Sequence, residues 1–333
     1  MERRRIRVLS VGGTIVSVHD PVLGGAVPAD ASALFAAATA GHGDIVVEQQ
    51  AFAAVSSFQL DLPTLAALCD RLDRLVADPG IDGIVVTHGT DTMEESVFAA
   101  ALRLPWRKPV IFTGAQRAMD APYPDGPANL SQAIRVAAEP VFGPHGPLIC
   151  FAGRVYGARS VVKQNTLALQ GFAARDGRVL AAVADSRPGP PAYPPEAPLY
   201  RAHRGPAARV DILAMALGCA PDLVSLAVQS GAAGLVIEAF GTGNVPPDVA
   251  LALEQVVHAG IPVAITSRCP AGPVRPIYAG AGGAIGLRAT GCLFAGDLGA
   301  AKVRLLLSAM LADGEDMAAI RAVFDRLDLE ARD

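Results

Sequence analysis

Short apolar runs alternate with longer amphipathic segments through the first part of the chain. Runs rich in valine, isoleucine and leucine predict strands over Ile6–Val11, Ile45–Ala51, Gly83–Thr87, Val110–Thr113 and Leu148–Phe151. Helical spacing of apolar residues predicts helices over Asp61–Asp78, Met93–Arg103 and Ala128–Ala138. Because the strands are apolar throughout and helices separate them, the pattern indicates a parallel sheet covered on both faces.

Seven prolines between Asp185 and Arg209 interrupt this alternation. Proline breaks helices and donates no hydrogen bond to a sheet, so the stretch predicts a linker. Beyond it, apolar runs predict a second, smaller sheet with strands at Val210–Met215, Gly234–Glu238 and Val263–Ser267. We therefore expect a two-domain α/β fold: an N-terminal domain at residues 1–190, a proline-rich linker at 191–209 and a C-terminal α/β domain at 210–333.

Composition narrows the class of protein. The 333 residues are 51% hydrophobic and 18% charged, which is typical of a folded globular chain. The net charge is −4 and Lys and Arg form no stripe, so we expect no nucleic-acid partner. The most apolar region, Ile212–Phe240, is interrupted by Pro221, Asp222 and Gln229, which predicts strand, helix and strand instead of a membrane span.

The five cysteines lie far apart in the sequence and form no Cys-x-x-Cys pair. Their odd number and spacing predict buried, reduced thiols in a reducing compartment, and neither disulfides nor a zinc site. No signal peptide precedes the first predicted strand, so we expect a cytoplasmic protein.

The six histidines show no metal-binding spacing, and we expect neither a metal nor an organic cofactor. His88 ends an apolar run, where a packed side chain is the expected role. No Gly-x-Ser-x-Gly elbow is present to favour a Ser-His-Asp hydrolase.

Ligands of open parallel sheets bind beyond the carboxyl ends of the strands. Five polar stretches follow predicted apolar runs, namely SVGGTIVS, SSFQL, THGTDTMEES, TGAQR and GTGN. These stretches hold the candidate functional residues.

The stretch THGTDTMEES permits two interpretations. Thr92 and Glu95 match a helix capping box, and Asp91 would lie where the helix dipole favours an anion. That interpretation leaves Gly89 and Thr90 unexplained, and a second hydroxyl beside a carboxylate is also a pattern of catalytic sites. The segment alone leaves both open.

The stretch SVGGTIVS is equally ambiguous. Gly12 and Gly13 form a two-residue turn pair between apolar runs, which is typical of a β-hairpin. Alternatively, the glycines end a strand and present the Thr14 hydroxyl to a cleft. Neither a dinucleotide-binding fingerprint nor a Walker motif accompanies them.

Considered together, these segments resemble the bacterial-type asparaginase/glutaminase family. The family's Gly-Gly-Thr-Ile signature stands at Gly12–Ile15, and its His-Gly-Thr-Asp-Thr signature stands at His88–Thr92. Further matching stretches follow in order at Thr113–Ala115, Asp125–Asn129, Lys163–Thr166, Gly241–Asn244, Ser267–Cys269 and Ala301–Arg304. The resemblance implies a two-domain asparaginase-like fold, with a larger N-terminal parallel-sheet domain and a smaller C-terminal α/β domain.

The resemblance also implies an activity: hydrolysis of the L-asparagine side-chain amide to L-aspartate and ammonia through an acyl-enzyme. Thr14 would be the nucleophile. Thr90, Asp91 and Lys163 would form a proton relay, since a lysine beside a carboxylate and a hydroxyl can carry a proton.

Substrate contacts follow from the same resemblance. Asp91 would bind the α-ammonium group, and Thr90 would help to hold the reacting carbonyl. Ser57 would bind the α-carboxylate, with Ser56 as the neighbouring alternative. The backbone N–H of Ala115 would complete the oxyanion site. Asp125 and Asn129 are expected to be structural, because Asp and Asn commonly bond loop backbone.

The chain departs from the family in its first loop. Residues 17–31, SVHDPVLGGAVPADA, predict a mobile lid, but the tyrosine that family lids supply to activate the nucleophile is missing. We expect water, or His19 from a closed lid, to take that role.

Other departures concern specificity and assembly. Phe58 stands where many relatives have a polar side chain that helps to bind the α-amino group. The family's usual assembly is a homotetramer of close dimers, in which a neighbouring subunit completes the site. In relatives the neighbouring subunit provides an asparagine and an acidic residue. Here Asn244 would be that asparagine. No carboxylate stands at the place of the acid, and Tyr278 is the nearest polar residue.

These departures leave alternatives open. One is a relative with an altered amide substrate, glutamine or another, and one is a low-activity ligand-binding homologue. A tRNA-linked amidotransferase is not expected, because those relatives carry an additional N-terminal region.

Overall fold

A computed structural model describes residues 3–30, 32–184 and 187–330 of the chain. They divide into two units, Met1–Pro198 and Leu199–Asp333, each with its own sheet and its own apolar core. The expected linker at residues 191–209 and the domain limits around it stay predictions. Asp185 and Ser186, at the start of the proline-rich stretch, lie outside the described residues.

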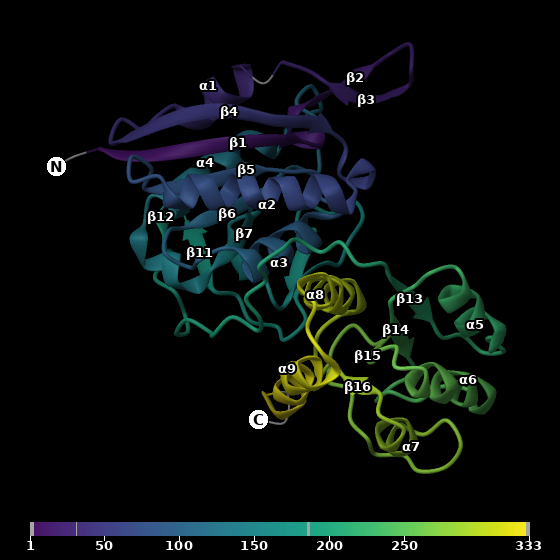
Figure 1. Ribbon diagram of the computed structural model, residues 1–333. Coiled ribbons are helices and arrows are strands. Elements are labelled where there is room, and N and C mark those ends of the chain that lie inside the picture. Colours follow the sequence, from purple (N-terminus) through teal and green to yellow (C-terminus); the bar gives the residue numbers. More distant parts are fainter. Residues whose placement is uncertain (1–2, 31, 185–186, 331–333) are drawn as a thin grey trace. The chain divides into compact units, whose positions relative to one another are not determined.

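The first unit is built on an eight-stranded sheet with strand order β12-β11-β8-β7-β6-β5-β1-β4 (Figure 1). Its strands are β1 (Arg4–Gly12), β4 (Ile45–Val55), β5 (Gly83–Thr87), β6 (Val110–Thr113), β7 (Pro147–Phe151), β8 (Arg154–Gly157), β11 (Ala181–Ala184) and β12 (Arg187–Pro188). Strands β4, β1, β5, β6 and β7 run parallel, whereas β8, β11 and β12 pair antiparallel. The expected parallel strands are confirmed, and the antiparallel edge makes the sheet mixed.

Of the two interpretations of Gly12 and Gly13, the strand end is the one that the structure shows, and the β-hairpin is not formed. Strand β1 pairs in parallel with both β4 and β5, so that Ser10 lies beside Thr87. Long-range pairing of a fully buried strand therefore prevails over the local turn pair. After Gly13 the chain forms a 3-10 turn, η1 (Thr14–Val16), and then an antiparallel hairpin of β2 (Ser17–Asp20) and β3 (Gly25–Pro28).

Helices cover both faces of this sheet. They are α1 (Ser32–Thr39), α2 (Leu62–Ala77), α3 (Met93–Arg103) and α4 (Gly126–Ala137). Helices α1 and α4 pack together on one face, and α2 and α3 pack together on the other (Figure 1). On the α4 face, Leu130 and Ile134 join Val85, Ile111 and Leu148 in one buried cluster. The smaller elements are η2 (Ser57–Gln59), η3 (Pro140–His145) and the two-stranded pair β9 (Val161–Lys163) and β10 (Phe172–Ala174).

The predicted capping box of Thr92 and Glu95 does not form. Thr92 is the N-cap residue of α3 without a side-chain cap bond, and its hydroxyl donates to the Ser57 carbonyl, 2.9 Å away. A tertiary partner therefore replaces the local one. A capping box forms instead at η2, where Ser56 and Gln59 bond each other's backbone.

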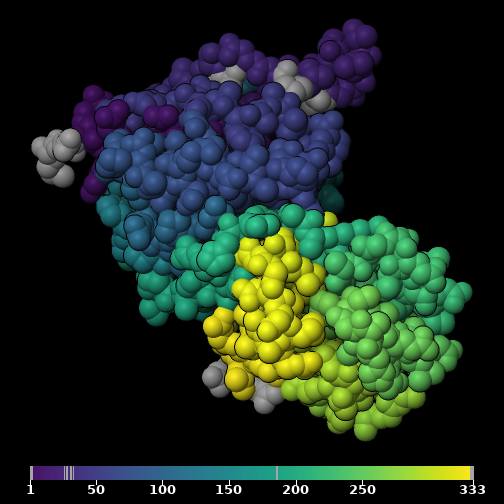
Figure 2. All heavy atoms as spheres, viewed as in Figure 1, coloured from purple at the N-terminus to yellow at the C-terminus, as the bar shows by residue number. Residues whose placement is uncertain are grey.

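The second unit contains a parallel four-stranded sheet of order β13-β14-β15-β16. The strands are β13 (Val210–Ala214), β14 (Gly234–Ala239), β15 (Val263–Ser267) and β16 (Leu293–Phe294), and the helices are α5 (Asp222–Gln229), α6 (Pro247–His258), α7 (Ala284–Ala289), α8 (Ala300–Asp313) and α9 (Met317–Glu330). Figure 2 shows α8 and α9 (yellow) as one continuous block of atoms within this unit. The three strands expected from the sequence are confirmed.

A search for membrane spans gives a negative result. Among the described helices, none combines the length and the apolar character that crossing a bilayer requires.

Candidate active site

A pocket of about 200 Å³ lies beyond the carboxyl ends of strands in the first unit. It is lined by Gly13, Thr14, Ser56, Ser57, Phe58, Gly89, Thr90, Asp91, Gln116, Lys163 and Thr166. These residues come from the loops after β1, β4, β5 and β6 and from β9 and the loop after it. The structure thus brings together five predicted site residues, Thr14, Ser57, Thr90, Asp91 and Lys163.

Lys163 joins two of these residues through its ammonium group. Its Nζ donates to Thr90 Oγ1 at 2.7 Å and to Asp91 Oδ1 at 2.6 Å. The Lys163 side chain is only 17% exposed, whereas Asp91 is 54% exposed. An ion pair with one partner this exposed stabilises a fold by only about 1 kcal/mol.

Strand β9 holds Lys163 at this place. The strand pairs with β10, and the backbone N–H of Lys163 donates to Glu94 Oε2 of helix α3 at 2.5 Å. Strand pairing and the bond to Glu94 therefore hold the backbone of Lys163 in place. A lysine in a solvated surface loop would not be held in this way.

The two threonine loops meet backbone to backbone. A Cβ on Gly13 would lie 2.3 Å from the Cα of Gly89, and Gly13 has a φ of +87°. Only glycine satisfies both conditions, and the close approach places Thr14 and Thr90 in one pocket. This explains why residue 13 is glycine. Throughout residues 3–30, 32–184 and 187–330, no donor or acceptor bonds the Thr14 hydroxyl.

Ser57 supports the neighbouring loop. Its side chain is buried, and its Oγ accepts from the Asp91 backbone N–H at 3.2 Å. A Cβ on Gly89 would lie 2.6 Å from that oxygen, so Gly89 also gives Ser57 its place. Ser57 and Ser56 both line the pocket, so either side chain can meet an anionic ligand there.

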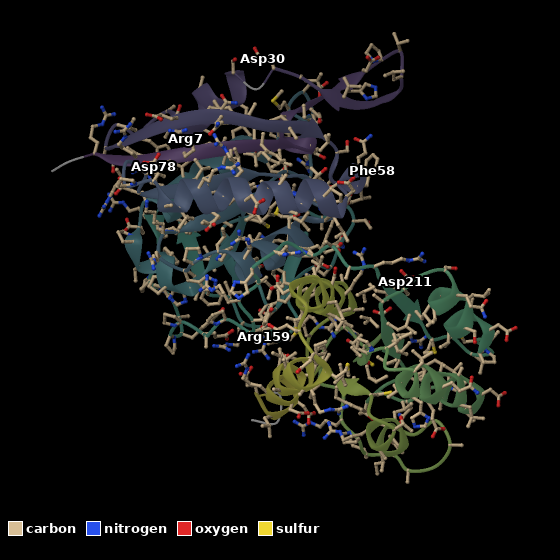
Figure 3. All side chains as sticks on the ribbon, in the orientation of Figure 1. Arg7, Asp30, Phe58, Asp78, Arg159 and Asp211 are labelled. Carbon is tan, nitrogen blue, oxygen red and sulfur yellow. The ribbon has the colours of Figure 1, made fainter. Side chains whose placement is uncertain are left out.

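Phe58 also lines the pocket, but its ring lies largely in solvent. It belongs to the short turn η2, its exposed fraction is 73%, and Figure 3 shows it at the edge of the first unit. An aromatic ring contributes apolar area at the pocket and no hydrogen bond to an ammonium group.

His88 lies outside this pocket and is wholly buried. Its Nδ1 bonds the Gly89 carbonyl at 2.7 Å and its Nε2 bonds Ser96 Oγ at 2.9 Å. A carbonyl oxygen only accepts, so the ring is the Nδ1–H tautomer and Nε2 accepts from Ser96. Burial lowers the pKa of His88 to about 4. His88 is thus a neutral, packed residue, as its strand position indicates.

Asp125 and Asn129 shape the loop after β6. The Asp125 carboxylate accepts from the backbone N–H of Gln116 at 3.0 Å and of Arg117 at 2.9 Å. Asn129 Nδ2 donates to Asp125 Oδ2 at 3.1 Å and to the Gly114 carbonyl at 3.0 Å. Both residues bond loop backbone, as expected for structural roles.

Two residues predicted to act at the site, Ala115 and His19, do not line the pocket. Ala115 is buried and does not line the pocket, whereas the following residue, Gln116, does. His19 is exposed on β2 and does not line the pocket, and its backbone N–H donates to Asp120 at 2.9 Å. Gln116 and Thr166 are pocket residues that the sequence interpretation missed. The stretch TGAQR points to the first, but its partners lie about fifty positions away in the sequence.

In the second unit, Asn244 acts within its own loop. Its Oδ1 accepts from the Ala284 backbone N–H at 3.1 Å, and its backbone pairs with Phe240. Tyr278 has a largely exposed ring. Any contribution to a neighbouring subunit's site stays a prediction for both.

Comparisons with known proteins agree with this geometry. Residues 5–189 match the family model described as asparaginase, N-terminal, and residues 209–324 match the glutaminase/asparaginase C-terminal domain. The chain belongs to the asparaginase family. A probable L-asparaginase of Deinococcus radiodurans is 35% identical over 327 residues, covering 96% of this chain and 97% of the relative.

Two further relatives differ in name. A crystal structure of a probable cytoplasmic L-asparaginase from Campylobacter jejuni superimposes with a TM-score of 0.85 at 26% identity, covering 97% of this chain and 99% of that one. A glutamyl-tRNA(Gln) amidotransferase polypeptide of Aeropyrum pernix is 29% identical, covering 97% of this chain and 78% of the relative. The two-domain asparaginase fold is therefore shown, and the relatives are named for two activities, L-asparaginase and glutamyl-tRNA(Gln) amidotransferase.

No metal cluster accompanies the site. In the part of the chain that the structure describes, no three His, Cys, Asp or Glu side chains are grouped as a metal site requires.

Proposed function

We propose that this asparaginase-family chain hydrolyses the side-chain amide of L-asparagine to L-aspartate and ammonia, with Thr14 as nucleophile. The observation that supports it is the joint placement of the Thr14 hydroxyl and the Lys163 contacts to Thr90 and Asp91 in one pocket. Binding alone needs no such relay, whereas acyl transfer needs a nucleophile and groups that move protons.

The proposed reaction has two steps. Thr14 Oγ forms a bond to the amide carbon, and the C–N bond breaks as the threonine proton leaves with nitrogen as ammonia. Water then attacks the acyl carbon and the bond from that carbon to Thr14 Oγ breaks. One proton of the water returns to Thr14, and the other passes to the released ammonia, giving ammonium, as the product leaves as the carboxylate. The relay of Thr90, Lys163 and Asp91 carries protons in these steps. Ser57 and Asp91 bind the α-carboxylate and α-ammonium groups. The Ala115 side chain is buried and does not line the pocket, so only its backbone N–H would serve the site, by donating to the oxyanion.

Phe58 favours a second candidate, an altered amide preference. Its ring lines the pocket but forms no hydrogen bond with an α-amino group. Glutamine or another amide is therefore the alternative substrate, and slow turnover the alternative kinetic behaviour. We also propose that the chain assembles into a homotetramer of close dimers and that it is located in the cytoplasm.

Ammonia release from L-asparagine, L-glutamine and D-asparagine tests the function. We expect release from L-asparagine, and a loss of about 10²- to 10⁴-fold in kcat for Thr90→Val, the range for a lost proton-transfer group. Thr14→Ala should remove turnover altogether. The matched control is Thr39→Val, which removes a threonine hydroxyl bonded to the Phe35 carbonyl, outside the pocket.

Other outcomes would change the proposal. Preferential release from glutamine would select the second candidate. Binding of asparagine without any release would show a ligand-binding homologue. His19→Ala separates the two bases: unchanged kcat and pH profile would exclude His19 and leave water.

A further inference from the structure

Gln116 lies between the Thr90 hydroxyl and the loop at residues 164–171. Its Oε1 is 3.3 Å from Thr90 Oγ1, and its Nε2 is 2.9 Å from the Ala168 carbonyl and 3.5 Å from the Asn165 carbonyl. Gln116 is the pocket residue that links the Thr90 hydroxyl to a loop some fifty positions further along the chain.

The surroundings decide the orientation of the Gln116 amide. A reversed amide would point its oxygen at the carbonyls of Ala168 and Asn165, and acceptors facing acceptors repel. The nitrogen must therefore face these carbonyls, so the oxygen faces Thr90. Because an amide oxygen only accepts, the single hydrogen of the Thr90 hydroxyl points at Gln116.

This arrangement determines the remaining bond of Thr90. With its hydrogen on Gln116, the Thr90 oxygen presents lone pairs to Lys163 Nζ, 2.7 Å away. Lys163 must then be the donor, both to Thr90 and to Asp91. The bonds form one directed chain from Lys163 through Thr90 and Gln116 to the Ala168 carbonyl.

Gln116 is itself held on two sides. Asp125 fixes its backbone N–H, as described above. On the side-chain end, a Cβ on Gly171 would lie 2.7 Å from Gln116 Nε2, so the absence of a side chain at Gly171 makes room for the amide. Both supports are independent of Thr90.

We propose that Gln116 is a positioning residue, which fixes the hydrogen of the Thr90 hydroxyl so that its oxygen faces Lys163 as an acceptor. The inference rests on the proposed function for its effect on rate, since it assigns a direction to the proposed proton relay. Without Gln116, the Thr90 hydrogen can turn toward Asp91 or the pocket. Fewer molecules then hold the relay in the productive arrangement.

Gln116→Met tests the rate effect, because methionine keeps the length and loses both amide bonds. We expect kcat to fall about tenfold, the effect of one neutral hydrogen bond, with KM within about twofold. The matched control is Gln132→Met, the same change in a residue outside the pocket and outside this loop, whose Oε1 accepts from the Gly153 backbone N–H at 3.0 Å. An unchanged kcat, or an effect on KM alone, would overturn the inference.

Gln116→Glu adds a pH profile that simple packing would not produce. A protonated carboxyl group reproduces the amide: its O–H donates to Ala168 and its carbonyl accepts from Thr90. The carboxylate instead faces two carbonyl oxygens. We expect this variant to approach wild-type kcat at low pH and to lose it as pH rises, relative to wild type and Gln116→Met. A profile parallel to wild type would contradict the proposed orientation.

A spectroscopic measurement separates this inference from the proposed function. The chain has three lysines, Lys108, Lys163 and Lys302, so selective ¹³Cε-lysine labelling gives three signals, with Lys163→Arg assigning one. At constant pH, Gln116→Met should move the Lys163 signal and leave the other two in place. A fixed Lys163 signal would refute the positioning role even if asparagine is hydrolysed. A moved signal in a chain that hydrolyses no amide would support the role and reject the function.

Discussion

At the scale of single residues, the site depends on which polar atoms donate hydrogen bonds and which accept them. Lys163 donates to Thr90 and Asp91, and the Thr90 hydroxyl donates to Gln116. His88, two positions from Thr90 in sequence, has both ring nitrogens engaged elsewhere. Neighbouring polar residues therefore differ in burial and in partner: Thr90 lines the pocket, whereas His88 is buried outside it.

His88 should make the protein less stable in mild acid. Its folded-state pKa of about 4 lies below the usual 6.5, so below pH 6.5 the unfolded chain binds a proton that the folded chain resists. The stabilisation is complete above pH 6.5 and is lost as pH falls toward 4, to an extent of about 3 kcal/mol. Urea unfolding at pH 7 and pH 4.5 measures this loss.

The control for this prediction is His88→Gln. Glutamine does not titrate, so the variant should be less stable at pH 7 but should show a smaller decrease between the two pH values. Burial also lowers the pKa of His42, so comparing variant with wild type isolates His88. Equal decreases in both proteins would show that His88 does not carry the effect.

At the scale of elements, the turn after β1 determines where Thr14 lies. Gly12 and Gly13 have φ values of +128° and +87°. A Cβ added to either glycine would lie 2.3 Å from a backbone atom of another loop or strand. Local sequence preference predicts a hairpin here, but pairing of β1 between β4 and β5 occupies both edges of the strand. A hairpin would have needed one of those edges.

Two glycines with similar φ values allow a test of this close packing. Gly13→Ala combines a φ of +87° with the contact to Gly89, whereas Gly24→Ala, at +66°, meets nothing within 4 Å. We expect Gly24→Ala to cost about 1 kcal/mol of unfolding free energy, and Gly13→Ala about 3 kcal/mol or more. Denaturant unfolding measures both, and equal losses would show that the loops separate without cost.

At the scale of the whole molecule, burial separates the five thiols. Cys69, Cys150 and Cys292 are buried, Cys219 is half-buried and Cys269 is exposed. The expectation that all five are buried is therefore wrong for the last two. Burial raises the pKa of Cys69 and Cys150 to about 12 and of Cys292 to about 11.

These differences predict a stepwise reaction with Ellman's reagent. At pH 8 the native chain should react rapidly at Cys269 and more slowly at Cys219, while the three buried thiols react only after unfolding in guanidinium chloride. Cys269→Ser should remove the rapid phase. Rapid reaction of three or more thiols in the native protein would contradict the described burial.

Much of the fold could be predicted because its determinants are local. A strand buried on both faces must be apolar along its whole length, so Gly83–Thr87 and Val110–Thr113 have the limits that their sequences indicate. Helix α3 also begins and ends where predicted, at Met93 and Arg103. The antiparallel edge was not predicted, since its strands are short and partly polar.

The sequence by itself determined the alternation of strands and helices, the family signatures and the residue types that reach the site. Only the tertiary structure decided their partners. Thr92 bonds Ser57 instead of its own helix, Gln116 lines the pocket, and the backbone of Gly89 leaves room only for glycine at position 13. The physical reason is that periodicity and turn preference act between near neighbours, whereas these contacts join loops that meet only when parallel strands align their carboxyl ends.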